Sequence, residues 1–351
     1  RKILKYNECK FQWLINPARK VLIVCENSGM KRILLVKTSS LGDVIHNLPV
    51  VTDILQQDPD AHIDWVVEEA FADIPNLHPA IKQVFTVAVR RWRKQFLSKK
   101  TWCEIAAFKK LVSQQPYDLI IDAQGLIKSA VMTAFAQGNK CGMDKHSARE
   151  PLASYFYNQK YPVARNQHAV TRNRVLAAQA CGYALLDNAP TYGIAAENNV
   201  LDFALPKAFL IGLHGTSKDS KLWPTKHWID LAKQLAAQNL SLVLPWASEA
   251  EQQRALAIVA NADNVIVLPK LSIAKLACII DQAWVAVGVD TGLSHLSVAL
   301  NIPTVAIYTD TNPERTGVMA SCNSKVINLG GVKQIPSVTS VLDAIQSITN
   351  H

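Results

Sequence analysis

Several common sequence features are missing from this chain of 351 residues. Its seven cysteines are scattered, odd in number and never form a C-x-x-C pair, so neither a disulfide framework nor a zinc site is indicated, and a reducing cytosol is favoured. No stretch reaches the ~18 to 20 uninterrupted apolar residues that span a bilayer, so we do not expect an integral membrane protein. The segment before Met30 lacks the apolar core and cleavage site of a signal peptide. We expect residues 1–29 to be an N-terminal extension without an assigned function.

The composition that is present is typical of a globular protein, with 49% hydrophobic and 19% charged residues. The length predicts two domains of roughly 150 residues, each able to bury its own core. A net charge of +9 favours anionic partners such as nucleic acid, phosphorylated sugars or acidic lipid surfaces. Charge alone does not choose among these partners.

Short runs of Val, Ile and Leu alternate with longer stretches of helical period, which is typical of parallel sheets with crossover helices. We expect strands near residues 32–37, 63–67, 84–88, 118–122, 209–214, 241–244, 265–268, 284–289 and 304–308. Helices are expected between the strands, for example at residues 44–55, 104–113 and 126–136.

The periodicity is interrupted at residues 188–205, where prolines flank a polar run, so the domain boundary is expected there. The predicted domains are residues 30–190 and residues 205–330, followed by a C-terminal helix within residues 336–351. Both domains are predicted to be doubly wound and Rossmann-like. Such domains direct the loops at their strand carboxyl ends towards a shared cleft, where the chemistry is expected.

The first candidate loop, residues 37–43 (KTSSLGD), follows a strand and opens a helix. Gly42 permits a tight turn, and Asp43 stands where a carboxylate could face the cleft and act as a base. The alternative is that Asp43 or Ser40 only caps the helix.

The second candidate loop, residues 214–224 (HGTSKDSKLWP), also follows a strand directly. Its hydroxyls, backbone amides and two lysines, Lys218 and Lys221, suit a diphosphate whose negative charge grows as it leaves. The spacing is not that of a P-loop, so nucleotide hydrolysis is not implied. The alternative is a polar surface loop with solvated lysines.

The third candidate loop, residues 289–295 (VDTGLSH), joins the end of an apolar strand to a helix. Free amides at the helix start could hold a phosphate, whereas Asp290 would repel a close anion and is more suited to meeting a hydroxyl or capping the helix. His295 lies five residues further on and need not share a face with Asp290. A packed or capping role for His295 stays open beside a ligand role.

A basic run occupies residues 90–100 (RRWRKQFLSKK), with six positive residues and no negative one. Such a run can grip phosphates, and Trp92, Phe96 and Leu97 could touch a lipid surface. The alternative is a solvated charged face. Lys128 and Arg149 could extend the basic site.

Taken together, these segments resemble the lipopolysaccharide heptosyltransferases of the ADP-heptose glycosyltransferase family, glycosyltransferase family 9. The resemblance runs from Met30 nearly to the end and rests on residues 37–46, 90–94, 122–126, 149–154, 223–224 and 290–295. It implies a GT-B fold in which the first domain binds the acceptor and the second binds ADP-heptose. It also implies that the C-terminal helix returns to brace the first domain.

The same resemblance implies an inverting transfer without a metal or other cofactor, in which Asp43 is the general base. The donor site would consist of Thr216, Ser217, Lys221, Glu251, Asp290, Thr291, Gly292 and His295. The acceptor site is expected to include Ser40, Gly42, Arg90, Arg91, Arg93, Lys94, Lys128 and Arg149. Two departures from the family pattern are Ser217, where Thr is usual, and residues 308–310 (YTD), where Tyr-Gly-Pro is usual.

The implied acceptor is Kdo attached to lipid A, whose carboxylates and phosphates would complement the positive charge. The protein would then work in the cytoplasm, peripherally at the inner membrane, with no nucleic acid as partner. One alternative is a related enzyme that adds the second or a later core heptose. A remote alternative is a non-catalytic basic binder of nucleic acid or acidic lipid, which gives no reason for the three loops at strand ends.

Overall fold

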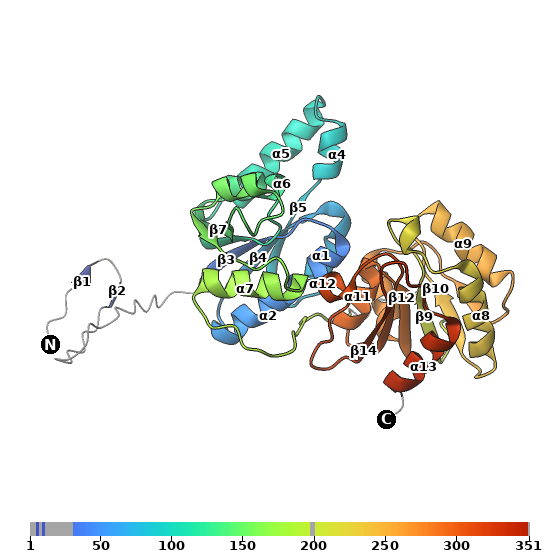
Figure 1. The fold of residues 1–351 in the computed structure, drawn as a ribbon. Helices are drawn as coiled ribbons and strands as arrows, with labels where there is room; N and C mark the ends of the chain where they lie inside the picture. Colours follow the sequence, from blue (N-terminus) through green and yellow to red (C-terminus); the bar gives the residue numbers. More distant parts are fainter. Residues whose placement is uncertain (1–4, 7–8, 11–30, 197–200, 350–351) are drawn as a thin grey trace, which may run out of the picture.

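The computed structural model describes residues 5–6, 9–10, 31–196 and 201–349. Most of its ordered structure lies in two halves, each built on a parallel sheet (Figure 1). The strands of the first sheet are β3 (Arg32–Val36), β4 (His62–Glu68), β5 (Ile81–Val87), β6 (Tyr117–Asp122), β7 (Gly138–Met143) and β8 (Gln159–Tyr161). Those of the second are β9 (Phe209–Leu213), β10 (Ser241–Leu244), β11 (Val265–Val267), β12 (Val285–Val289), β13 (Thr304–Tyr308) and β14 (Val326–Gly330).

The two sheets have the same strand order. The first runs β5-β4-β3-β6-β7-β8 and the second runs β11-β10-β9-β12-β13-β14. All neighbouring strands within each sheet are parallel. The order reverses beside the first strand of each half, which is the doubly wound pattern. The expected α/β class is therefore confirmed.

Helices connect the strands and cover both faces of each sheet. In the first half they are α1 (Leu41–Ile45), α2 (Leu48–Gln57), α3 (Asp73–Asn76), α4 (Val89–Lys94), α5 (Lys99–Val112), α6 (Ile127–Phe135) and α7 (Ala169–Cys181). In the second half they are α8 (Thr225–Ala236), α9 (Glu249–Val259), α10 (Ile273–Asp281), α11 (Gly292–Ala299), α12 (Pro313–Thr316) and α13 (Val338–Thr349). Because both faces are covered, the central strands are apolar at nearly every position.

Alternate residues of each central strand enter different cores. In β3, Leu34 and Val36 pack towards α4, α5 and α6, whereas Ile33 and Leu35 pack towards α2 and α7. The core that contains Ile33 continues into the second half and includes Ile211 of β9. The two halves are therefore joined by a continuous apolar core rather than by the linker alone.

The expected single helix at residues 44–55 is divided in two. Helix α1 ends at Ile45, and α2 begins at Leu48, with Asn47 before it and Pro49 in its first turn. Proline has no backbone N–H to donate and is tolerated only in a first helical turn. The break keeps α1 short and directs it along the boundary between the halves.

The expectation that the C-terminal helix braces the first domain is wrong. Helix α13 packs against α8, β13 and β14 of the second half (Figure 1). Val341, Ala344, Ile345 and Ile348 on its apolar face are buried in the core formed with Val305 and Ile307. Burying this face against its own sheet removes apolar surface from water without a crossing of the chain to the other half.

The N-terminal extension is described only at β1 (Lys5–Tyr6) and β2 (Cys9–Lys10), which pair antiparallel. The remainder of residues 1–29 lies outside the described residues. Between α7 and β9 the described chain contains neither helix nor strand, and residues 197–200 lie outside the description. This stretch includes residues 188–205, where the domain boundary was expected.

Candidate active site

The three candidate loops converge on one cavity between the halves, at the carboxyl ends of β3, β9 and β12. Its volume is about 450 Å3, and we call it the cleft cavity. Helix α1 from the first half packs against α11 from the second, and both helices contribute residues to the wall of this cavity (Figure 1). The approach is close, since a Cβ added at Gly292 would lie 2.6 Å from Leu41 Cγ. Segments far apart in the chain thus form one site, as expected for two doubly wound halves.

Asp43 is held at the first-half wall of the cleft cavity by the start of its own helix. Its Oδ2 accepts hydrogen bonds from the Ser40 backbone N–H at 2.9 Å and from the Ser40 hydroxyl at 3.2 Å. Ser40 is the N-cap residue, so the capping alternative is correct as a description of local structure. Capping and cleft exposure coexist, because the side chain is 27% exposed and lines the cavity.

The loop before Asp43 is fixed from beneath by buried polar groups. The side-chain oxygen of Gln124 accepts from the backbone N–H groups of Thr38 and Ser39, at 3.1 and 3.2 Å. Lys37 donates to Ala123 O at 2.7 Å, and burial lowers the pKa of this lysine. Lys128 Nζ donates to the Ser39 hydroxyl at 2.6 Å. These contacts hold the loop that leads to Asp43 in place.

Positive charge borders Asp43 on the first-half side. Arg149 places Nη1 3.7 Å from Asp43 Oδ2, and its side chain is 60% exposed. Arg90 stacks over Phe71, with its guanidinium carbon 5.1 Å from the ring centroid, and its backbone N–H donates to Glu68. Both arginines line the cleft cavity, where they can meet an anionic sugar.

The second half supplies an ion pair opposite Asp43. Lys221 Nζ lies 2.7 Å from Asp290 Oδ2. The Thr216 hydroxyl donates to the Asp290 backbone carbonyl at 2.7 Å. Thr309, at one departure from the family pattern, donates its hydroxyl to Ser220 O and ties the end of β13 to the Lys221 loop. A lysine fixed in this way can meet the developing charge of a diphosphate.

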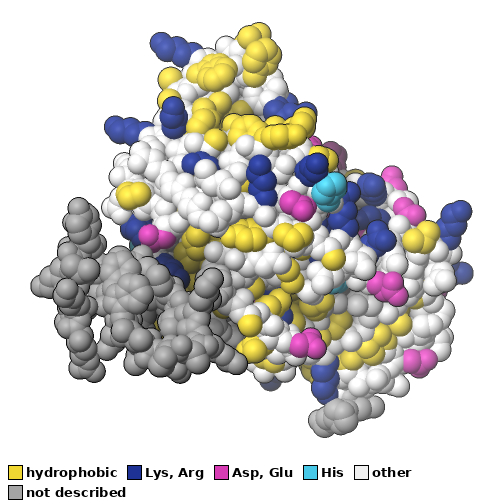
Figure 2. Space-filling model, turned by 60° about the vertical axis from the view of Figure 1, so that its left-hand side comes forward, with side chains coloured by type: hydrophobic (Ala, Val, Ile, Leu, Met, Phe, Trp, Pro, Cys, Tyr) yellow, Lys and Arg dark blue, Asp and Glu magenta, His cyan; other side chains and the backbone are white. Residues whose placement is uncertain are grey.

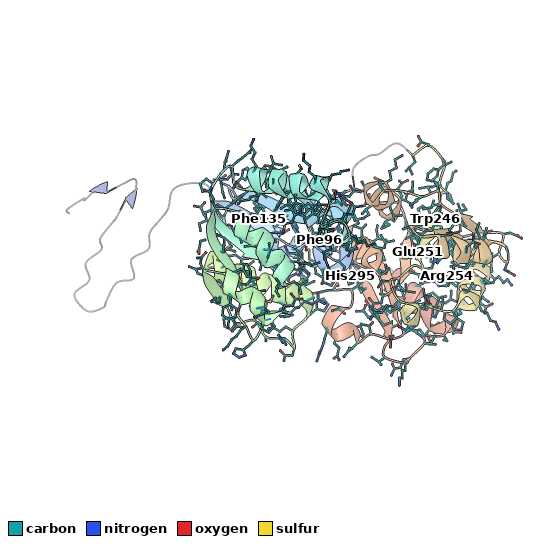
Figure 3. The ribbon with its side chains drawn as sticks, turned by 90° about the horizontal axis from the view of Figure 1, so that it is seen from above. Phe96, Phe135, Trp246, Glu251, Arg254 and His295 are labelled. Atoms are coloured by element: carbon teal, nitrogen blue, oxygen red, sulfur yellow. The ribbon has the colours of Figure 1, made fainter. Side chains whose placement is uncertain are left out.

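A second cavity of about 610 Å3 adjoins the cleft cavity and extends along the second half. The two cavities share Leu41, Phe71, Thr216, Ser217 and Thr291. Trp246 and Glu251 line its far end (Figure 3). Glu251 accepts from the backbone N–H of Ala247 at 2.7 Å, which orients its carboxylate at the start of α9. A flat ring beside a carboxylate suits a nucleoside.

Histidines fill the boundary beneath the cleft cavity. His46 Nε2 and His295 Nδ1 are 3.1 Å apart, and His168 Nε2 lies 2.9 Å from Gly317 O across the boundary. Burial lowers the pKa of His295 to about 4 and lowers the pKa of His46 well below its ordinary value. His295 is therefore both packed and a wall of the cavity, so the two alternatives for it are not exclusive.

The cleft cavity brings together most of the expected site residues. It is lined by Ser40, Gly42, Asp43, Arg90, Arg149, Thr216, Ser217, Lys221, Asp290, Thr291, Gly292 and His295. Glu251 lines the second cavity instead, and Arg93 and Lys128 line a groove on the outer side of α6. Lys94 is exposed on α4 and lines none of these three.

Arg91, expected in the acceptor site, is engaged elsewhere. It pairs with Glu69 at 3.0 Å and with Glu104 at 2.8 Å, and these hydrogen bonds raise the pKa of Arg91 above its ordinary value. Glu104 also accepts from Trp92 Nε1 at 2.7 Å. Arg91 thus joins α4 to α5.

The wall residues that were not predicted include Phe71, Trp246 and Thr316. Phe71 ends the 3-10 helix after β4, and Trp246 stands two residues beyond the end of β10. Their positions after strands were the available indication, because strand-end loops carry ligands in this architecture. Thr316 lies in α12, a helix too short for its periodicity to be recognised.

Two features are absent from the part of the chain that the structure describes. Among the described residues, no group of three or more His, Cys, Asp or Glu side chains could hold a metal ion. No helix in that same part of the chain is both long and apolar enough to cross a membrane.

Comparison with known proteins defines the family. The model of glycosyltransferase family 9 (heptosyltransferase) matches residues 105–341. Lipopolysaccharide heptosyltransferase 1 of Pseudomonas aeruginosa is 48% identical over 288 residues, which cover 82% of this chain and 81% of that protein. The chain therefore belongs to glycosyltransferase family 9, the heptosyltransferases of lipopolysaccharide assembly.

Solved structures support the same assignment. The Escherichia coli heptosyltransferase WaaC with ADP has a TM-score of 0.82 and 40% identity, covering 90% of this chain and 99% of that one. The same enzyme with ADP-2-deoxy-2-fluoro heptose gives a TM-score of 0.80 and 39% identity with the same coverage. The expected GT-B glycosyltransferase fold is thereby confirmed.

Proposed function

We propose that this protein transfers heptose from ADP-heptose to Kdo of a Kdo-lipid A acceptor, with inversion at the anomeric carbon. The main support for this proposal is the cleft cavity, in which Asp43 lines one wall and the Lys221–Asp290 pair lines the other. A base and a stabiliser of the leaving group on opposite walls match the two ends of an in-line displacement. The WaaC complexes with ADP and with an ADP-heptose analogue support the donor class.

Asp43 acts as the general base. Its Oδ2 is engaged by Ser40, whereas Oδ1 makes no hydrogen bond among the described residues and is available to the acceptor hydroxyl. As the hydroxyl oxygen attacks the anomeric carbon, Asp43 takes its proton and ADP departs from the opposite face. One carboxylate suffices, because no glycosyl-enzyme forms.

The second half holds the donor. The adenosine lies in the second cavity near Trp246 and Glu251, and the diphosphate lies beside Thr216, Ser217 and Lys221. The start of α11 at Thr291 and Gly292 adds free backbone N–H groups. Lys221 and these amides stabilise the departing diphosphate without an obligatory metal.

The first half holds the acceptor, with Arg90 and Arg149 meeting its carboxylate and phosphates. Because lipid A is anchored in a bilayer, the protein works at the cytoplasmic face of the inner membrane. Nucleic acid is not a partner.

The test is a transfer assay with ADP-heptose, a chelator and two acceptors, one ending in Kdo and the other already carrying the first heptose. The proposal expects transfer to the Kdo-terminated acceptor that survives chelation. Transfer only to the heptose-terminated acceptor would assign the chain to a later step. Loss of transfer on chelation, restored by a divalent cation, would contradict the metal-free mechanism.

A further inference from the structure

An apolar groove lies on the outer side of the first half, away from the boundary between the halves. It has a volume of about 710 Å3 and is formed by α4, α5, α6 and the segment between α4 and α5. Its apolar walls include Trp92, Phe96, Trp102, Ile105, Ile127 and Val131. We call it the α4–α6 groove. Figure 1 shows α4 and α5 projecting from the body of this half.

The rim of the α4–α6 groove exposes large apolar side chains to solvent. Phe96 is 59% exposed, Leu97 is 84% exposed and Trp102 is 59% exposed. Monomeric proteins rarely expose neighbouring apolar side chains of this size unless the patch meets a partner or a membrane.

The exposed rim is held in place by hydrogen bonds. Trp102 Nε1 donates to Phe96 O at 2.8 Å, and the Thr101 hydroxyl donates to Gln95 O at 2.9 Å. The polar atom of the tryptophan is thus satisfied within the protein, while its apolar ring stays in solvent. These hydrogen bonds fix the segment between α4 and α5, so its apolar side chains form a defined surface rather than part of a loosely packed loop.

Positive charge surrounds this apolar rim. Lys94, Lys99 and Lys100 are exposed beside it, and Arg93 and Lys128 line the groove itself. Glu150 is the one acidic residue among the lining residues. Figure 2 shows apolar side chains and Lys or Arg side chains gathered at this end of the molecule. Large apolar side chains ringed by cations match the boundary between headgroups and acyl chains of an anionic bilayer.

One hydrogen bond links the groove to the loop that carries Asp43. Lys128 lines the groove and donates to the hydroxyl of Ser39, at 2.6 Å. Ser39 precedes Ser40, which holds Asp43. A lipid surface at the groove would therefore meet the half of the molecule that also carries the acceptor wall of the cleft cavity.

We propose that the α4–α6 groove is the surface by which this protein binds an anionic lipid bilayer, with Phe96, Leu97 and Trp102 entering the acyl boundary. The lysines of the rim meet the headgroups. This inference rests on the proposed function, because a protein bound to the bilayer through this groove would hold its Asp43 site close to a lipid-anchored acceptor. Vesicle binding requires no transfer, so the two proposals can fail separately.

The test is co-sedimentation of the full chain with phosphatidylcholine vesicles that contain phosphatidylglycerol. The double variant Phe96→Ser with Leu97→Ser should bind at least about tenfold more weakly than the parent. Its transfer to a deacylated, water-soluble acceptor should stay at the parent rate. A matched control, Val332→Ser with Ile335→Ser, removes two apolar side chains that are 55% and 57% exposed in the second half and should bind as the parent does.

Two results would overturn the proposal. One is vesicle binding by the Phe96 and Leu97 variant that equals that of the parent. The other is a dimeric parent that this variant converts to a monomer in light scattering, since the groove would then join two copies of the chain.

The contribution of the rim lysines to vesicle binding is tested separately by the double variant Lys99→Gln with Lys100→Gln. Each lysine near an anionic surface contributes ~1 kcal/mol, so binding should weaken roughly fivefold per lysine on vesicles with phosphatidylglycerol. Binding to vesicles of phosphatidylcholine alone should not change. An equal loss on both kinds of vesicle would contradict a role for the lysines in meeting headgroups.

Discussion

The two halves of this molecule share one sheet order and differ in the loops at the ends of their strands. In the first half the loop after β3 carries Asp43, with Arg149 beside it. In the second half the loops after β9 and β12 carry Lys221 and Asp290, which pair with each other. The same scaffold thus presents a carboxylate beside cations on one side and a fixed lysine beside hydroxyls on the other. The two halves therefore differ in the side chains of their strand-end loops and not in the order of their sheets.

The largest effect is expected when the first half loses the carboxylate of Asp43. Asp43→Asn should lower the rate of heptose transfer by roughly 10^2 to 10^4, because the amide cannot accept the acceptor proton. Steady-state transfer to a Kdo-terminated acceptor measures this effect. The matched control is Asp60→Asn, an exposed aspartate on the turn before β4, which should transfer at the parent rate. Wild-type activity in Asp43→Asn would remove the base from the mechanism.

The next effect concerns a buried ion pair of the first half. Arg174 on α7 donates to both carboxylate oxygens of Asp53 on α2, at 2.7 and 3.0 Å, and both side chains are at least nine-tenths buried. Arg174→Met leaves the carboxylate buried and unpaired, so the free energy of unfolding should fall by about 3–5 kcal/mol. Denaturant titration measures the loss. Combining the variant with Asp53→Leu should recover most of it, and no recovery would mean that packing rather than charge is responsible.

A smaller effect should depend on pH at the boundary between the halves. Burial lowers the pKa of His295 to about 4 from an ordinary 6.5, so the unfolded chain binds this proton more tightly than the folded one. Well above pH 6.5, His295 is neutral in both states and has no effect on the free energy of unfolding. As the pH falls from 6.5 towards 4, the unfolded chain takes up this proton before the folded one, so the free energy of unfolding decreases. Between pH 6.5 and 5 this group should cost the folded state about 2 kcal/mol. His295→Gln should flatten this dependence in unfolding experiments, and an unchanged slope would show that other groups carry it.

The smallest effect is expected when the first-half wall of the cleft cavity loses the charge of Arg149. Arg149→Ala should raise the KM for the acceptor about tenfold, since it removes a charge-assisted contact from the cleft cavity. The KM for ADP-heptose should not change, because the donor lies against the other half. Lys145→Ala, an exposed cation outside the cavity, is the control. A rise in the donor KM alone would reverse the assignment of the two walls.

Much of the fold could be predicted because buried central strands are apolar at nearly every position. Strands β3, β4, β5 and β6 and the first five of the second half were all expected near where they lie. Three strands nearer the sheet edges were missed: β7 (GNKCGM) contains two glycines, β8 has three residues, and β14 is partly exposed. Partly exposed strands carry no continuous apolar run, so the pattern that identifies a central strand is missing from them.

The loops that form the site could be predicted from the sequence, but the ion pairs between its side chains could not. The loops that carry Asp43, Thr216 and Asp290 were expected because each follows a strand, whereas the roles of these residues were implied by the family resemblance. The engagement of Arg91 by Glu69 and Glu104 depends on how α5 returns beside α4, which no local pattern encodes. The place of α13 likewise depends on which apolar face is left uncovered after the sheet has formed.

The central claim, that the second half holds the donor while the first supplies the base, is tested most directly by calorimetric titration of ADP. The account predicts that Asp43→Asn binds ADP as the parent does, whereas Lys221→Met binds it at least about tenfold more weakly. Lys218→Met, an exposed lysine of the same loop that lines neither cavity, should bind as the parent does. Weakened ADP binding by Asp43→Asn together with parental binding by Lys221→Met would contradict the account.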